Sequence, residues 1–241
     1  MKRALVLGAT GLVGSSLSRM LLDNPDYELV RVFTRRSLGF KHDRLREHLV
    51  DFEKPDAWSG KVIGDIAFLC LGTTLKKAGS KQAQFRVDYE YQFEFAKRAL
   101  NNGVKSLILV SSAGASASSP FFYMKMKADL ENTLKELPFK QLVFIRPGAL
   151  MGKRSEKRAG ELAGVRILRF LNSLGMFLRY KPIQAEQVAA AMLAAAGNSE
   201  EGIKIYELGE LFGLSESSLT ERLADLLSEA NPLISSYSND G

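Results

Sequence analysis

Cysteine and histidine are scarce in this chain of 241 residues. It contains one cysteine, Cys70, and two histidines, His42 and His48. A single cysteine excludes an intramolecular disulfide and any all-cysteine metal site, and the two histidines lack the spacing of metal ligands. Cys70 ends an apolar run and is expected to fill the core. Because no export signal is visible either, the sequence predicts a cytoplasmic protein without a bound metal.

Long hydrophobic runs are also absent. No stretch approaches the roughly 18 consecutive apolar residues that a membrane span needs. The run from Ala4 to Leu7 is too short for a signal peptide and leads into a glycine turn, so we expect a first strand there. With 46% hydrophobic and 25% charged residues, the chain can bury a core of ordinary size. We therefore expect one soluble domain over residues 1–234, with its core at about 1–148, cap elements at about 149–234 and a disordered tail at 235–241.

The formal net charge of +6 raises the question of a polyanionic partner. Basic residues cluster between Lys153 and Arg169, but Glu156 and Glu161 interrupt this cluster and no aromatic residues interleave with it. We attribute the charge to solubility and to the phosphates of a small ligand, and expect neither nucleic acid nor membrane as a partner.

Short apolar runs alternate with longer segments of helical period, which is typical of a parallel sheet covered by helices on both faces. Strands are expected at Arg3–Gly8, Glu28–Thr34, Glu47–Val50, Asp65–Leu71, Ser106–Ser112, Gln141–Arg146 and Ile203–Glu207. Helices are expected at Gly11–Leu22, Gln82–Asn101, Pro120–Leu137, Leu162–Leu178, Ala185–Ala196 and near Glu216–Leu227. The predicted fold class is α/β, a Rossmann-type doubly wound parallel sheet with a small, mostly helical C-terminal cap.

One face of the predicted helix Gln82–Asn101 carries apolar side chains at intervals of three or four residues. This spacing indicates core packing rather than an aromatic recognition stripe. The residues of this face are Phe85, Tyr89, Phe93, Ala96 and Leu100.

A glycine-rich turn directly follows the first predicted strand and opens a helix. Its sequence is Gly8, Ala9, Thr10, Gly11, Leu12, Val13 and Gly14. The three glycines permit a tight turn, close approach of the backbone to a pyrophosphate, and close packing of helix on strand. The helix N-terminus offers free N–H groups and a positive dipole end to phosphates. We therefore predict a dinucleotide site here.

The residues at the end of the second strand indicate which dinucleotide the site binds. A site selective for NAD needs a carboxylate about 20 residues beyond the glycine motif, but Arg35 and Arg36 stand there. Arginine's planar fork suits a 2′-phosphate, so the expected cofactor is NADP(H). Further contacts are expected at the carboxyl edge of the sheet, from residues after the third and fourth strands. These residues are Asp51, Phe52, Leu71, Gly72 and Thr73.

A tyrosine and a lysine lie four residues apart on the predicted helix Pro120–Leu137. Tyr123 and Lys127 therefore share one face. A cation beside a phenol stabilises the phenolate and eases proton transfer to or from a carbonyl or alcohol oxygen. Ser111 and Ser112 close the fifth strand, and one of them can donate a hydrogen bond to the same oxygen. Because successive strand side chains point to opposite faces, we expect one serine to serve, and favour Ser112.

Taken together, these motifs resemble the atypical short-chain dehydrogenase/reductase group that includes the Tat-interacting tumour-suppressor oxidoreductase and its bacterial relatives. The resemblance covers about the first 160 residues. It rests on Gly8 to Gly11, Thr34 to Arg36, Val50 to Glu53, Cys70 to Thr74, Lys77 to Gly79, Arg86 to Asp88, Ser111-Ser112, Tyr123 to Lys127 and Arg146 to Gly148.

The resemblance implies roles for several residues. Tyr123 would be the catalytic residue, Lys127 would contact the nicotinamide ribose, and Leu150 and Arg158 would help to close over the cofactor. The asparagine that many such reductases carry on the helix after the fourth strand is replaced, by Asp88 or a neighbour.

The leading hypothesis is an NADPH-dependent reductase of a small carbonyl compound. The alternative is a sensor in which bound NADP(H) controls a protein interaction with little or no turnover. A nucleotide-sugar epimerase is disfavoured by the arginine pair and the small cap. The amphipathic segment Leu162–Leu178 either covers the active site or pairs with a second subunit to form a homodimer.

Overall fold

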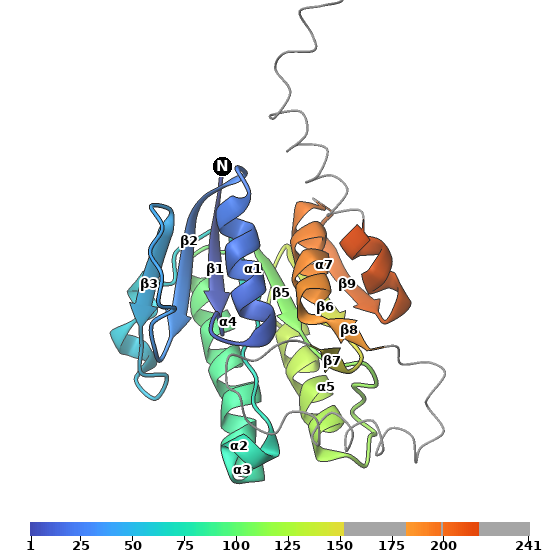
Figure 1. Ribbon diagram of the computed structural model, residues 1–241. Coiled ribbons are helices and arrows are strands. Elements are labelled where there is room, and N and C mark those ends of the chain that lie inside the picture. Colours follow the sequence, from blue (N-terminus) through green and yellow to red (C-terminus); the bar gives the residue numbers. More distant parts are fainter. Residues whose placement is uncertain (152–181, 199, 217–241) are drawn as a thin grey trace, which may run out of the picture.

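The computed structural model describes residues 1–151, 182–198 and 200–216. Its main sheet has seven parallel strands in the order β3-β2-β1-β4-β5-β6-β9 (Figure 1). The order reverses between β1 and β4, and ligands of such sheets bind at the carboxyl ends of the strands beside this reversal. The strands are β1 (Lys2–Leu7), β2 (Tyr27–Thr34), β3 (Leu45–Leu49), β4 (Ile66–Leu69), β5 (Ser106–Val110), β6 (Gln141–Arg146) and β9 (Gly202–Glu207).

Helices cover both faces of this sheet (Figure 1). On one face α1 (Leu12–Asp23) packs against α7 (Ala185–Gly197). On the other lie α4 (Tyr91–Asn101) and α5 (Phe122–Lys135). Alternate side chains of each strand feed the two cores: in β1, Val6 enters the α1–α7 core and Leu5 the α4–α5 core. The predicted doubly wound Rossmann fold is confirmed.

Several short elements surround this framework. The predicted helix Gln82–Asn101 is divided into α3 (Lys81–Phe85), a π-helical turn η3 (Arg86–Glu90) and α4. The remaining elements are the 3₁₀ turns η1 (Pro55–Ala57) and η2 (Ser59–Lys61), helix α2 (Leu75–Ala78), and the parallel pair β7 (Leu150–Met151) and β8 (Ile183–Gln184).

The C-terminal part is helical, as expected, but its strand does not stand apart as a cap. β9 pairs with β6 along its whole length, so it extends the main sheet. Residues 209–216 continue as a helix. The predicted helix Leu162–Leu178, most of the helix near Glu216–Leu227 and the tail 235–241 lie outside the described residues. In the part that is described, no helix is long and apolar enough to cross a membrane.

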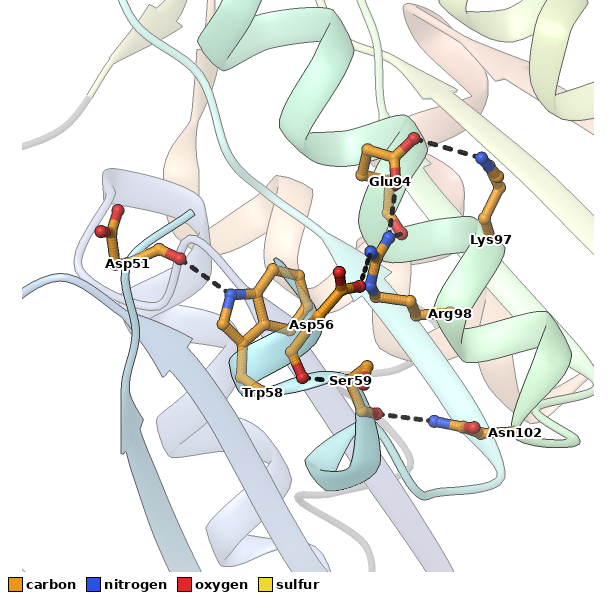
Figure 2. Close-up of polar contacts among 8 residues, drawn as sticks. All are labelled: Asp51, Asp56, Trp58, Ser59, Glu94, Lys97, Arg98 and Asn102. Atoms are coloured by element: carbon orange, nitrogen blue, oxygen red, sulfur yellow. Dashed lines mark hydrogen bonds and ion pairs between the residues drawn. The ribbon is translucent and has the colours of Figure 1, made fainter. Parts of the chain in front are cut away.

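Side-chain contacts fix the segment between β3 and β4, which has little regular structure. The Trp58 indole donates to the Asp51 carbonyl at 2.9 Å. Arg98 of α4 pairs with Asp56 at 2.9 Å, and the Asn102 amide donates to the Ser59 carbonyl at 2.8 Å (Figure 2). These contacts hold the segment against α4, and thereby fix the start of the loop that follows β3.

Candidate functional site

The glycine turn between β1 and α1 has the geometry of a backbone site for an anion. Gly8 has φ +89°, and a side chain there would lie 2.6 Å from the Leu71 backbone nitrogen. A Cβ on Gly14 would lie 2.3 Å from the Gly8 carbonyl oxygen, so both positions require glycine. Gly11 caps α1 without any side-chain hydrogen bond, and the first turn of α1 contains no acid. The helix therefore presents uncapped N–H groups that suit a phosphate.

The side chains of this turn point in different directions. Ala9 and Val13 are buried in the core, and Leu12 packs against it. Their backbone, rather than their side chains, is what a ligand at the turn would meet. Thr10 faces the other way and lines a pocket.

That pocket lies at the carboxyl end of the sheet and has a volume of about 480 Å³, within the range usual for small-molecule sites. It brings together residues from the ends of β1, β2 and β4, as the switch-point rule expects. Its lining consists of Gly8, Thr10, Phe33, Thr34, Arg35, Arg36, Phe52, Leu71 and Lys77. A larger hollow of about 640 Å³ is lined by residues 40–43 and 45–47 and contains none of the predicted site residues.

Both arginines predicted to bind the cofactor lie at this pocket. Arg35 and Arg36 are exposed just after β2. The Thr34 hydroxyl donates to the Arg36 carbonyl at 2.8 Å and accepts from the Arg36 N–H at 3.2 Å. This local turn fixes the backbone that carries the two guanidiniums.

Of the two residues predicted after β3, one lines the pocket and the other does not. Phe52 lines the pocket, where it is nearly buried and stacks on Tyr91 with ring centroids 5.3 Å apart. Asp51 is exposed and is not part of the lining, and one of its carboxylate oxygens accepts the Glu53 N–H at 3.0 Å. Lys77 of α2 is a lining residue that the sequence reasoning did not assign to the site. Its signal was its place just after β4, at the same sheet edge.

Tyr123 and Lys127 do share one face of α5. The Lys127 Nζ lies 5.8 Å from the centroid of the Tyr123 ring, within cation–π range. Tyr123 is 36% exposed and Lys127 only 2%. An accessible phenol thus stands beside a buried ammonium.

The two serines after β5 are in different environments. Ser111 is buried, and its hydroxyl donates to the Glu131 carboxylate. Ser112 is partly buried, and its Oγ lies near the Ala113 carbonyl and 3.7 Å from the Met124 Sδ. Ser111 is therefore hydrogen-bonded in the interior. Ser112 instead contacts Met124, the residue of α5 that follows Tyr123.

Asp88, in the π-helical turn, contacts Lys127 directly. Its carboxylate lies 3.5 Å from the Lys127 Nζ and accepts the Thr73 N–H at 2.8 Å. Burial raises the pKa of the Asp88 carboxyl, while Lys127 and the Thr73 N–H act in the opposite direction. The sequence pointed to Asp88 or a neighbour in place of an asparagine but did not assign it a role.

Other expectations concern the periphery of the site. Leu150 is 42% exposed on β7, and Arg158 lies outside the described residues. Cys70 contacts Met192, and burial raises the pKa of its thiol, so it behaves as a packing residue. Among the described residues, no cluster of three potential metal ligands occurs.

Comparison with known proteins identifies the family. The HIM1 family model matches residues 61–181, and the semialdehyde dehydrogenase NAD binding domain matches residues 3–87. "Protein FMP52, mitochondrial" of Candida albicans is 34% identical over 203 residues, 82% of this chain and 89% of that protein. "Protein HTATIP2" of Rattus norvegicus is 38% identical over 164 residues, 66% of this chain and 67% of that protein. The chain belongs to the FMP52 and HTATIP2 family.

Membership of the FMP52 and HTATIP2 family confirms the predicted resemblance to an atypical short-chain dehydrogenase/reductase group. It also corrects one expectation. The sequence predicted a cytoplasmic protein, but FMP52 relatives from Candida albicans and Saccharomyces cerevisiae are named as mitochondrial. The cytoplasmic prediction is therefore wrong, because the scarcity of cysteine and the lack of a visible export signal do not discriminate between these compartments.

Solved structures support the fold of this family. A UDP-N-acetylglucosamine 4-epimerase from Methanobrevibacter ruminantium matches with a TM-score of 0.65 and 17% identity, covering 86% of this chain and 76% of that one. The protein gox2253 matches with a TM-score of 0.64 and 20% identity, covering 90% and 74%. The chain thus shares the Rossmann fold of these proteins.

Proposed function

We propose that this protein is an NADP(H)-dependent oxidoreductase that reduces a small carbonyl compound. The observation that carries the proposal is the accessible Tyr123 phenol beside the buried Lys127 ammonium, with 5.8 Å between Nζ and the ring centroid. The pair occurs in a family whose fold binds nicotinamide dinucleotides.

The proposed cofactor fits the residues present at the pocket. The pocket reaches the glycine turn at Gly8 and Thr10, and α1 offers uncapped N–H groups for a pyrophosphate. Arg35 and Arg36 supply two guanidiniums for a 2′-phosphate. Neither position supplies the carboxylate with which NAD-selective sites hold the ribose 2′-hydroxyl.

A bound nicotinamide cofactor would supply the hydride for the proposed carbonyl reduction. Tyr123 donates its phenolic proton to the carbonyl oxygen, which becomes the alcohol. Lys127 stabilises the phenolate left behind and binds the nicotinamide ribose. Ser112 donates a hydrogen bond to the carbonyl oxygen and so favours the negative charge that develops there.

The test is NADPH oxidation with a panel of aldehydes, ketones and quinones, using the wild type and Tyr123→Phe. We expect turnover with at least one substrate and a loss of at least about 100-fold in kcat for the variant, the usual scale of general acid catalysis. Tyr206→Phe, at a tyrosine of the edge strand β9, is the matched control and should keep full turnover. NADPH binding without turnover on any substrate would replace this proposal with the sensor hypothesis.

A further inference from the structure

A stripe of polar side chains is buried along the helical segment after β4. Gln84, Asp88 and Gln92 recur at intervals of four residues and are 4%, 1% and 0% exposed. The aromatic residues predicted to form the core face, including Phe85 and Tyr89, are only partly buried, and these two stack on each other. Burying polar groups is costly unless they are paired. The hydrogen-bond and ion-pair partners of these three side chains therefore indicate which parts of the structure they position.

Two members of the stripe hold the turn after β4. The Asp88 Oδ2 accepts the Thr73 N–H at 2.8 Å, and the Gln84 amide donates to the Thr73 carbonyl at 3.3 Å. A Cβ on Gly72 would lie 3.3 Å from the Asp88 Oδ1, so the glycine leaves space for this carboxylate. The turn Leu71–Thr74, one residue of which lines the pocket, is thus held by the helix behind it.

The second oxygen of the same carboxylate holds Lys127. The Asp88 Oδ1 lies 3.5 Å from the Lys127 Nζ, and the two side chains are 1% and 3% exposed. A buried ammonium requires a counter-charge to stay charged. Within the described residues, Asp88 is the carboxylate in ion-pair range of this ammonium.

We propose that Asp88 is a positioning residue that fixes the Lys127 ammonium and the Leu71–Thr74 turn relative to each other, and so sets where Lys127 meets the cofactor. The inference rests on the proposed function, in which Lys127 binds the nicotinamide ribose. A carboxylate suits this task because both of its partners are donors, and it accepts from each. An asparagine can accept from one of them but presents its NH₂ group to the other.

The experiment is a double-mutant cycle with Asp88→Asn, Lys127→Met and the combined variant, measured at about pH 8 where carboxylates are ordinarily ionised. The readouts are NADPH affinity and the thermal midpoint of the protein without cofactor. Glu90→Gln is the matched control, because Glu90 lies two residues away on the exposed side of the same turn. It should leave NADPH affinity unchanged.

Asp88→Asn alone should weaken NADPH binding about tenfold or more, the scale of one lost charge-assisted hydrogen bond. In the Lys127→Met background it should cost no further affinity. It should lower the thermal midpoint of the wild type but raise that of Lys127→Met, because there it removes a buried carboxylate that has lost its partner.

Additive losses of affinity, or a lowered midpoint in both backgrounds, would overturn the proposal, because Asp88 would then act independently of Lys127. If Asp88→Asn alone does not fold, the combined variant Asp88→Asn/Lys127→Met is the test. It should fold if Asp88 serves to pair with Lys127, and it should not fold if Asp88 serves only to hold Thr73. A wild type that binds no NADPH would refute the proposed function instead, and the thermal midpoints would still test the pair.

Discussion

The Ser111 hydroxyl donates a hydrogen bond to the buried carboxylate of Glu131 on α5. The same carboxylate receives two bonds from the Arg146 guanidinium, at 2.9 and 2.6 Å, and Arg146 also pairs with Glu207 of β9. This network joins β5, α5, β6 and β9. Glu131 raises the pKa of Arg146 mainly through its side-chain hydrogen bond. Ser111 therefore has a structural role, which leaves Ser112 for the proposed chemistry.

The first prediction separates the two serines. Ser112→Ala should lower kcat for carbonyl reduction by about 10- to 100-fold, because it removes one donor to the developing oxyanion. Its thermal midpoint should stay close to that of the wild type. Ser111→Ala should do the reverse: a stability loss of about 1.5–3 kcal/mol, the usual net value of one hydrogen bond to a charged group, with kcat nearly unchanged. Steady-state kinetics and denaturant unfolding of both variants give the comparison, and a larger kcat loss for Ser111→Ala would reverse the assignment.

The second prediction concerns Lys77, the basic residue of α2 that lines the pocket. If its ammonium acts on the cofactor phosphates, Lys77→Ala should weaken NADPH binding about 3- to 30-fold, as expected for one solvent-exposed charged contact. Lys76→Ala removes the same charge from the neighbouring position of the same helix, outside the lining. Titration calorimetry should show little change in NADPH affinity for Lys76→Ala. Equal losses for both lysine variants would show that Lys77 acts through the overall positive charge of α2 rather than through a direct contact.

The third prediction concerns the start of the sheet, where Asp65 accepts bonds from the Arg3 backbone at 2.8 Å and from its guanidinium. These bonds lower the pKa of Asp65, the side-chain bond most strongly. A carboxyl with a lowered pKa stabilises the fold above its unfolded pKa of about 3.9 and loses that contribution as pH falls through its folded pKa.

Asp65→Asn should therefore destabilise the protein near pH 7, and the difference from the wild type should shrink as the pH falls below about 4. Both side chains of this pair are at least 40% exposed, so the effect near pH 7 should stay below about 1 kcal/mol. Unfolding free energies across pH test this, with Asp43→Asn at an exposed loop position as the control. A difference that does not depend on pH would show that the pair does not stabilise the fold through its charge.

The sequence predicted the fold well because the central strands β1, β4, β5 and β6 are short apolar runs whose alternate side chains enter two cores. Its strand positions from Arg3 to Arg146 agree with the structure to within a few residues. It did not place β9 within the main sheet, since pairing of β9 with β6 is a long-range contact without a local signal.

The sequence predicted those site residues that form motifs with a local spacing. It predicted less well the residues that are brought to the site by the packing of the fold. The glycine turn, the arginine pair and the Tyr123–Lys127 spacing are local patterns. The buried stripe around Asp88 was missed because its aromatic neighbours give the stronger helical period, and periodicity alone does not show which face is buried. Lys77 was missed because α2 is one short turn, and its place at the pocket depends on the fold around β4.

The proposed preference of the pocket for NADP(H) can be tested through the affinities of NADPH and NADH for the wild type and for Arg35→Ala/Arg36→Ala. Lys41→Ala, an exposed basic residue outside this pocket, is the control. We expect the wild type to prefer NADPH and the double variant to lose about 100-fold or more in NADPH affinity, because each charge-assisted bond contributes about 1.5–3 kcal/mol. NADH affinity should change by less than about threefold, since it lacks the 2′-phosphate. Equal losses for the two cofactors, or a wild type that prefers NADH, would show that Arg35 and Arg36 do not bind a 2′-phosphate.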